Sequence, residues 1–170
     1  KVCVDFTYKP DNPNRFVTVD KKLMVNIFEK NDLQPNPKAD TDIYYALLEH
    51  VIPHEFERNH ILDWIAFQIQ NPGVKIRQAI ILQSDEFQLG KGSLFDVHRD
   101  ILGHRNTRKI ELGEALDKGK GYLVNAQTVL IDEAKSKGSW SEKAQLINTL
   151  KTIITEGSIG IRQLYKEYSE

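Results

Sequence analysis

Residues 79–95, AIILQSDEFQLGKGSLF, carry the clearest structural signal in this sequence. Ala79 to Leu82 is a continuous apolar run of the kind that forms a strand buried on both faces of a parallel sheet. A polar loop follows, and the apolar residues from Leu94 onward have helical spacing up to Gly103. The stretch therefore predicts a strand, a loop and a helix, in that order.

The loop ends in Gly90, Lys91, Gly92 and Ser93. A loop of this kind between a strand and a helix suits a nucleoside triphosphate, because backbone N–H groups of the loop and of the first helical turn point at the phosphates. We expect Gly90 and Gly92 to let the backbone wrap closely around the ligand. Lys91 would add a positive charge that reaches the outer phosphates.

Asp85 departs from the usual pattern of such loops, G-x-x-x-x-G-K-[ST]. It stands where the first glycine is expected, and Gly92 stands where the hydroxyl residue is expected, with Ser93 directly after it. Asp85 and Glu86 also place negative charge near the phosphates. If directed inward, each would cost on the order of a few kcal/mol at an effective dielectric constant of ~20. A working loop, a damaged loop and a surface turn that resembles one are all compatible with these residues.

A second motif, TVLIDE at residues 128–133, is an apolar strand that ends in two carboxylates. In an open α/β sheet the carboxyl end of such a strand lies beside the phosphate loop. Asp132 is predicted to hold Mg²⁺, through water, and Glu133 to polarise the attacking water. The alternative is that the two carboxylates only cap the next helix.

The rest of the chain surrounds these motifs in a regular order. Alternating apolar residues in the first thirty positions predict a small β-meander or an extended arm. Two amphipathic helices then follow a proline-containing linker, with apolar stripes at Ile43–Val51 and Phe56–Ile69. Thr107–Leu112 is a further predicted strand. Strands that alternate with helices indicate an α/β domain with a parallel sheet.

We divide the chain accordingly into three parts. These are an N-terminal β-rich arm and linker at 1–38, a helical subdomain at 39–75, and the first part of a P-loop NTPase core at 76–170 that ends in a β-hairpin.

Composition restricts the possible functions. The chain has 170 residues and a net charge of -1, so a nucleic acid would have to be held by a local basic patch or by a ring of subunits. A single cysteine, Cys3, excludes an internal disulfide framework. No apolar run approaches the ~20 residues of a membrane span, and no secretory leader is evident. We expect a cytoplasmic protein without a membrane partner. Because the sequence starts without methionine, we interpret it as a piece of a longer one.

Other candidate sites are less well supported. The five histidines show no helical i, i+4 pairing and no cysteine partners, so a zinc site is not expected. His98 falls at a polar position of the predicted helix and is expected to be exposed. Trp64 and Trp140 are expected to pack in the core and at a helix start.

Several segments together resemble the helicase part of phage and plasmid primase-helicases, a superfamily 3-like group of the AAA+ ATPases. These segments are HILDWIAFQIQNPGVKIRQAIIL at 60–82, LGKGSLF at 89–95, TVLIDEAKS at 128–136 and LINTLKTIITEGSIGIRQLYKEYSE at 146–170. The resemblance runs from about residue 40 to the end and is loose before that. We expect the C-terminal region of a phage primase-polymerase to be similar as well.

The resemblance implies an ATP-driven helicase that forms a homo-oligomeric ring, expected to be a hexamer, on single-stranded DNA during DNA replication. It places Lys91 and Ser93 on the phosphates of ATP and on Mg²⁺, and it gives Asp132 and Glu133 their metal and water roles. In that family a hairpin after the last helix faces the pore. The matching residues would bind DNA: Arg162 and Lys166 on the backbone, and Tyr165 stacked on a base. An ordinary solvated hairpin is the alternative for Arg162 and Lys166.

The family's core continues with a sensor strand and an arginine that reaches a neighbouring subunit, and the sequence stops before either. The resemblance therefore implies a truncated three-layer core, and we expect this fragment alone to be inactive as an ATPase. A degenerate, non-hydrolysing fold that serves oligomerisation and DNA holding is the second hypothesis, motivated by Asp85. A nucleoside monophosphate kinase, which shares the Gly-Lys-Gly-Ser form, is the third.

Overall fold

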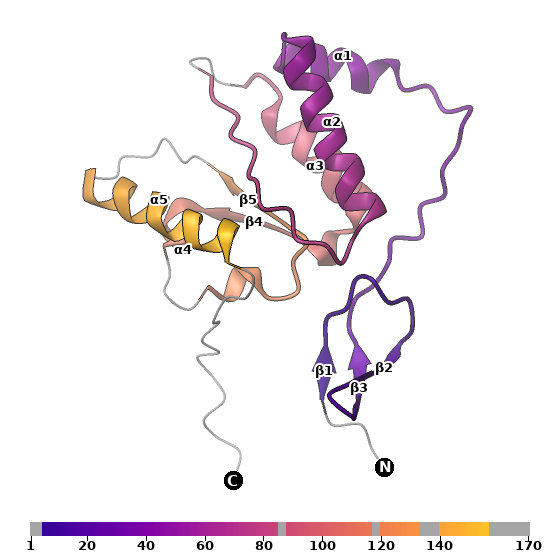
Figure 1. Cartoon of the computed structure of the whole chain (residues 1–170). Helices are drawn as coiled ribbons and strands as arrows, with labels where there is room; N and C mark the ends of the chain where they lie inside the picture. The colour runs from indigo at the N-terminus through magenta and orange to yellow at the C-terminus, as the bar shows by residue number, and fades with distance from the viewer. Residues whose placement is uncertain (1–4, 85–87, 117–119, 133–139, 157–170) are drawn as a thin grey trace. The chain divides into compact units, whose positions relative to one another are not determined.

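The computed structural model describes residues 5–84, 88–116, 120–132 and 140–156 (Figure 1). The chain forms two compact units. The first comprises Lys1–Lys75 and Ile80–Asn106, and the second comprises Ile76–Ala79 and Thr107–Glu170. The chain is mixed α/β, as the sequence predicted.

The N-terminal part of the first unit is a three-stranded sheet of β1 (Phe6–Thr7), β2 (Phe16–Val19) and β3 (Lys22–Asn26). β2 and β3 form an antiparallel hairpin. Its two loop residues, Asp20 and Lys21, both have positive φ, which matches the right-handed twist of the strands. β1 pairs in parallel with β3, so the strand order is β1-β3-β2 and the predicted meander is wrong. Local alternation identifies strands, but it does not identify their neighbours.

Three α-helices follow in the first unit, α1 (Asp42–Val51), α2 (Glu55–Gln70) and α3 (Lys91–Leu102), and a 3-10 turn, η1 (His104–Asn106), comes after α3. Their buried core consists of Leu48, Ile52 and Leu94. The corner between α1 and α2 lies at Pro53, where Arg58 donates hydrogen bonds to the carbonyl oxygens of Ile52 (2.9 Å) and Pro53 (2.6 Å). The two predicted helices before residue 75 are therefore confirmed.

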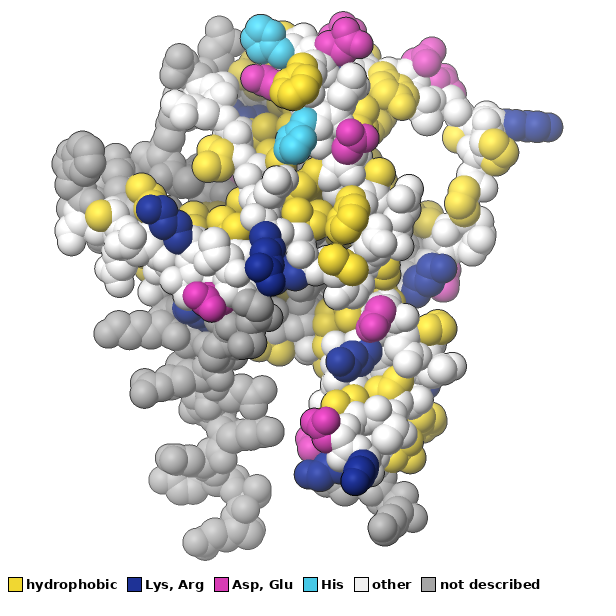
Figure 2. Space-filling view, in the orientation of Figure 1, with side chains coloured by type: hydrophobic (Ala, Val, Ile, Leu, Met, Phe, Trp, Pro, Cys, Tyr) yellow, Lys and Arg dark blue, Asp and Glu magenta, His cyan; other side chains and the backbone are white. Residues whose placement is uncertain are grey.

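The apolar stripes of these helices are only partly buried. Ile43 and Phe56 are 83% and 84% exposed, and Phe67 and Ile69 also remain at the surface. Figure 2 shows hydrophobic side chains on the visible face of the first unit, close to acidic ones. Helical spacing shows which residues share a face, whereas the packing of α1, α2 and α3 determines how much of that face is covered.

The predicted strand Ala79–Leu82 is not formed. Residues 80–84 adopt neither helix nor strand, and Ile81 is 84% exposed. An apolar run becomes a buried strand only where a neighbouring strand completes its hydrogen bonds, and none pairs with this segment in the part of the chain that the structure describes.

The second unit contains β4 (Thr107–Glu111), α4 (Leu112–Ala115), β5 (Thr128–Asp132) and α5 (Trp140–Thr155), with a short 3-10 turn, η2 (Gly121–Leu123), before β5. β4 and β5 are parallel, and their register places Glu111 opposite Asp132. Ile110, Leu112, Ala115 and Tyr122 form the buried core, and Leu150 and Ile153 of α5 pack against it. Both predicted strands and the following helix are confirmed.

Candidate functional site

Gly90 determines how the predicted phosphate loop enters α3. It is the residue before the helix and has φ 86° and ψ 10°, a left-handed conformation that L side chains rarely adopt. A Cβ atom built at this position would lie 2.9 Å from Cδ1 of Leu47 in α1. The left-handed conformation therefore favours glycine at position 90, whereas the Leu47 methyl group, at the end of a flexible side chain, could move to admit a Cβ atom.

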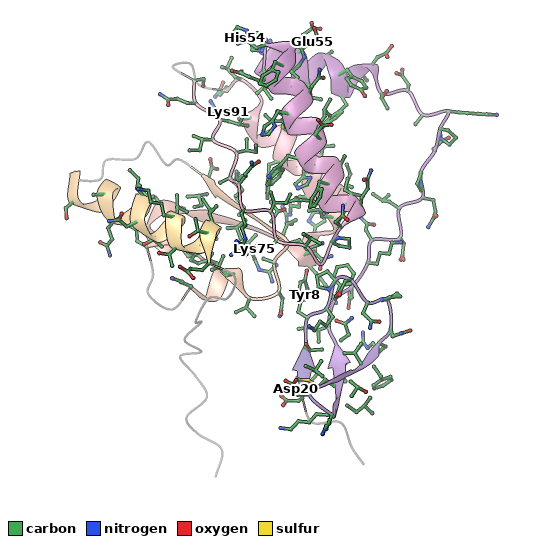
Figure 3. All side chains as sticks on the ribbon, viewed as in Figure 1. Tyr8, Asp20, His54, Glu55, Lys75 and Lys91 are labelled. Carbon is green, nitrogen blue, oxygen red and sulfur yellow. The ribbon has the colours of Figure 1, made fainter. Side chains whose placement is uncertain are left out.

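Lys91 is the first residue of α3 (Figure 3). Its half-buried side chain donates a hydrogen bond from Nζ to Oγ of Ser84, at the other end of the loop. Among the described residues no side chain caps α3 at Gly90, and the first N–H groups of a helix have no partner within the helix, which is the arrangement that suits an anion. The ammonium group and the helix start therefore lie on the same short segment.

The other loop residues differ from Gly90 in their surroundings. Gly92 and Ser93 are exposed, and a Cβ atom at Gly92 would meet nothing within 4 Å. No steric constraint thus explains the glycine at position 92. Asp85 lies outside the described residues, so its effect on the loop stays a prediction.

His98 contradicts the sequence-based expectation. It is buried at 3% exposure on the inner side of α3, with Nε2 2.8 Å from Oε1 of Gln68 in α2. The Trp64 ring lies against it, with 5.9 Å between ring centroids. Burial lowers the pKa of His98 to about 4, so the imidazole is neutral at pH 7.

The sequence positions of the buried residues in α3 could have predicted the burial of His98. His98 is four residues from both Leu94 and Leu102, which are buried, and residues four apart share a helix face. Trp64, which was expected in the core, is half-buried, and α5 begins at Trp140 as expected.

Asp132 ends β5 in the second unit. Its Oδ2 atom lies 2.9 Å from Nζ of Lys109 in β4, and the two side chains are 48% and 47% exposed. Asp132 therefore reaches solvent, but it already carries an ion pair that the sequence did not predict. Glu133 lies outside the described residues.

The donor chemistry of these residues suits Mg²⁺. This ion takes oxygen ligands, keeps several waters and usually binds through one or two carboxylates together with substrate phosphates. The carboxylate of Asp132 and the hydroxyl of Ser93 are donors of this kind. Among the described residues no group of three or more His, Cys, Asp or Glu side chains could hold a metal ion.

The predicted site residues thus fall into separate groups. Lys91 is joined to Ser84 in the first unit, and Asp132 to Lys109 in the second. The convergence of Lys91 with Asp132 and Glu133 stays a prediction. Arg162, Tyr165 and Lys166 lie outside the described residues, together with the predicted hairpin. Among the helices that are described, none is long and apolar enough to cross a membrane.

No protein-family model matches the sequence. No curated protein matches it either. Two solved structures of the NrS-1 C-terminal region are similar to this chain. One apo structure matches with a TM-score of 0.77 at 21% identity, and the match covers 94% of this chain and 38% of the NrS-1 chain. The A form apo structure has a TM-score of 0.68 at 19% identity, with the same coverage.

This chain therefore spans well under half the length of the chains to which it is similar. At these identities the likeness concerns the fold alone: nearly the whole of this chain has the fold of a part of the NrS-1 C-terminal region.

Proposed function

We propose that this chain is an ATP-dependent DNA helicase or translocase module of a phage replication protein, acting as a ring on single-stranded DNA. The C-terminal region of NrS-1 has this fold, and the motifs of this chain resemble the helicase part of phage and plasmid primase-helicases. The replication context rests on that likeness, and the ATPase chemistry rests on the residues of this chain.

One observation carries the ATP-binding part of the proposal. Gly90 takes a left-handed conformation immediately before a helix whose first residue is Lys91. This is the local geometry that presents backbone N–H groups and an ammonium group to a phosphate. The positive φ of Gly90 shapes the entry of the loop into α3, and the Lys91 ammonium follows it directly on the first helical turn.

In the proposed mechanism each residue has one task. The N–H groups at the start of α3 and the Lys91 ammonium hold the phosphates and stabilise the charge that develops on them. Ser93 and Asp132 would hold Mg²⁺, which neutralises phosphate charge when it is bound. Glu133 would orient and polarise the attacking water. Arg162, Lys166 and Tyr165 would hold the DNA strand.

Two observations favour a second candidate, a non-hydrolysing ATPase fold that serves oligomerisation and DNA holding. The segment before the loop is not a strand, whereas a phosphate loop ordinarily follows one. The Lys91 ammonium is also already engaged by Ser84. Both features are compatible with a loop whose working geometry has been lost.

Calorimetric titration with Mg²⁺-ATP separates the two candidates. We expect micromolar binding by the wild-type chain, at least tenfold weaker binding by Lys91→Ala, and unchanged binding by Lys38→Ala, which removes an equal charge from an exposed position of the linker. Absence of binding by the wild-type chain would favour the degenerate fold. Equal binding by Lys91→Ala and Lys38→Ala would remove Lys91 from the site.

Hydrolysis is tested on the full-length protein. Lys91→Ala and Glu133→Gln should each abolish DNA-stimulated ATP turnover, but only Lys91→Ala should also weaken nucleotide binding. Turnover that persists in Glu133→Gln would refute its assignment as the residue that polarises water.

A further inference from the structure

We infer that the Lys109 ammonium is a resident cation, that is, the counter-ion already paired with the Asp132 carboxylate in the protein. We further infer that it sets the affinity of the carboxyl end of β5 for a divalent cation. The inference rests on the proposed function, because it takes Asp132 as the metal-binding residue. Neither the phosphate-loop pattern nor the Asp-Glu strand assigns a role to Lys109. Its role follows from the pairing of β4 with β5.

The register of β4 and β5 gathers three charges at one edge of the sheet. Glu111 and Asp132 are directly opposite each other in this parallel pair. Lys109 precedes Glu111 by two residues and so projects from the same face of β4. Like charges directly opposite each other are unfavourable in a sheet, and the Lys109 ammonium, 2.9 Å from Asp132, offsets that repulsion.

This arrangement imposes a competition. A divalent cation that approaches Asp132 meets a carboxylate already neutralised by Lys109, and it must share or displace that ammonium. Since both side chains are about half exposed, the ion pair is screened by water and is weak. Lys109 therefore lowers cation affinity without blocking it, and the nucleotide phosphates would supply the rest of the binding energy.

The test is a titration of the 170-residue chain with Mn²⁺ alone at low ionic strength, with free Mn²⁺ followed by electron paramagnetic resonance. Replacing Lys109 by Met should tighten binding about threefold, which equals roughly 0.7 kcal/mol at about 1.4 kcal/mol per tenfold change. Lys109→Arg keeps the charge and should bind as the wild type does. Lys109→Gln repeats the charge removal in case the Met variant folds poorly.

Lys151→Met is the matched control, because it removes one positive charge from an exposed position of α5 in the same unit. If Lys109→Met and Lys151→Met bind Mn²⁺ equally, the resident-cation role is overturned, while Asp132 keeps its place in the proposed function. Asp132→Asn should abolish the binding. If Asp132→Asn binds as tightly as the wild type, or if no protein in the series binds Mn²⁺, the metal assignment of Asp132 fails, and the role of Lys109 fails with it.

Discussion

The hydroxyl of Tyr8 donates a hydrogen bond of 2.9 Å to Oδ1 of Asn106, ninety-eight positions later in the chain. Asn106 is 1% exposed, and its Nδ2 atom donates to the carbonyl oxygens of Glu29 and Leu102, each at 2.8 Å. One amide thus joins the N-terminal segment to the C-terminal end of α3. The helix that begins with Lys91 is held at its other end by this contact.

Replacement of Asn106 by Ala should therefore destabilise the first unit by about 1–3 kcal/mol, because the buried carbonyl oxygen of Leu102 and the part-buried one of Glu29 lose their donor. Tyr8→Phe removes only one hydrogen bond and should cost roughly 1 kcal/mol. Urea unfolding followed by circular dichroism measures both values. A loss in Asn106→Ala no greater than in Tyr8→Phe would show that Asn106 does not have this anchoring role.

The two loop glycines should respond in opposite ways to alanine. Gly90→Ala meets both a positive φ and the side chain of Leu47, and we expect a loss of about 1–2 kcal/mol. Gly92 lies in the first turn of α3 with open space around it, so Gly92→Ala should be neutral or stabilising by up to about 1 kcal/mol. Urea midpoints at pH 7 compare the two variants. Equal losses would contradict the conformation assigned to Gly90.

His98 should make stability depend on pH. Its pKa is about 4 in the folded chain and 6.5 in the unfolded chain, so the unfolded chain binds more protons between these values. Stability is therefore full above about pH 6.5 and falls as the pH decreases toward 4, by a few kcal/mol in total at about 1.4 kcal/mol per pKa unit. The free energy of unfolding of wild type and His98→Gln, measured between pH 7 and pH 4, tests this.

The His98→Gln variant has no titrating group at this position. We expect it to be less stable than wild type at pH 7 and to lose less stability upon acidification, so that the difference narrows. Parallel pH profiles for the two proteins would show that His98 does not titrate as its burial implies.

The DNA-binding residues predicted in the C-terminal hairpin can be distinguished by salt. Arg162→Ala and Lys166→Ala should each lower the slope of log affinity for single-stranded DNA against log salt by about 0.7, because each removes one phosphate contact. Tyr165→Ala should lose roughly 1–3 kcal/mol at every salt concentration, since stacking is not ionic. Fluorescence anisotropy with an oligothymidine measures both effects. Unchanged affinity in all three variants would favour an ordinary solvated hairpin.

The sequence alone determined the features that depend on a few neighbouring residues. The polar turn at Asp20-Lys21, the helix boundaries near Gly90 and Gly103, and the strands β4 and β5 all follow from local signals, and the structure contains each of them. Such signals are reliable because a glycine's conformation or the periodicity of a helix acts within one or two turns of the chain.

Only the tertiary structure decided which surfaces meet. The apolar run at 79–82 was expected to be buried and His98 to be exposed, whereas Ile81 is exposed and His98 is buried. Lys91 meets Ser84 at the other end of its own loop, and Asp132 meets Lys109 of the neighbouring strand β4. The physical reason is that burial depends on which parts of the folded chain pack against a residue. The type of a residue determines only the free-energy cost of burying it, not whether it is buried.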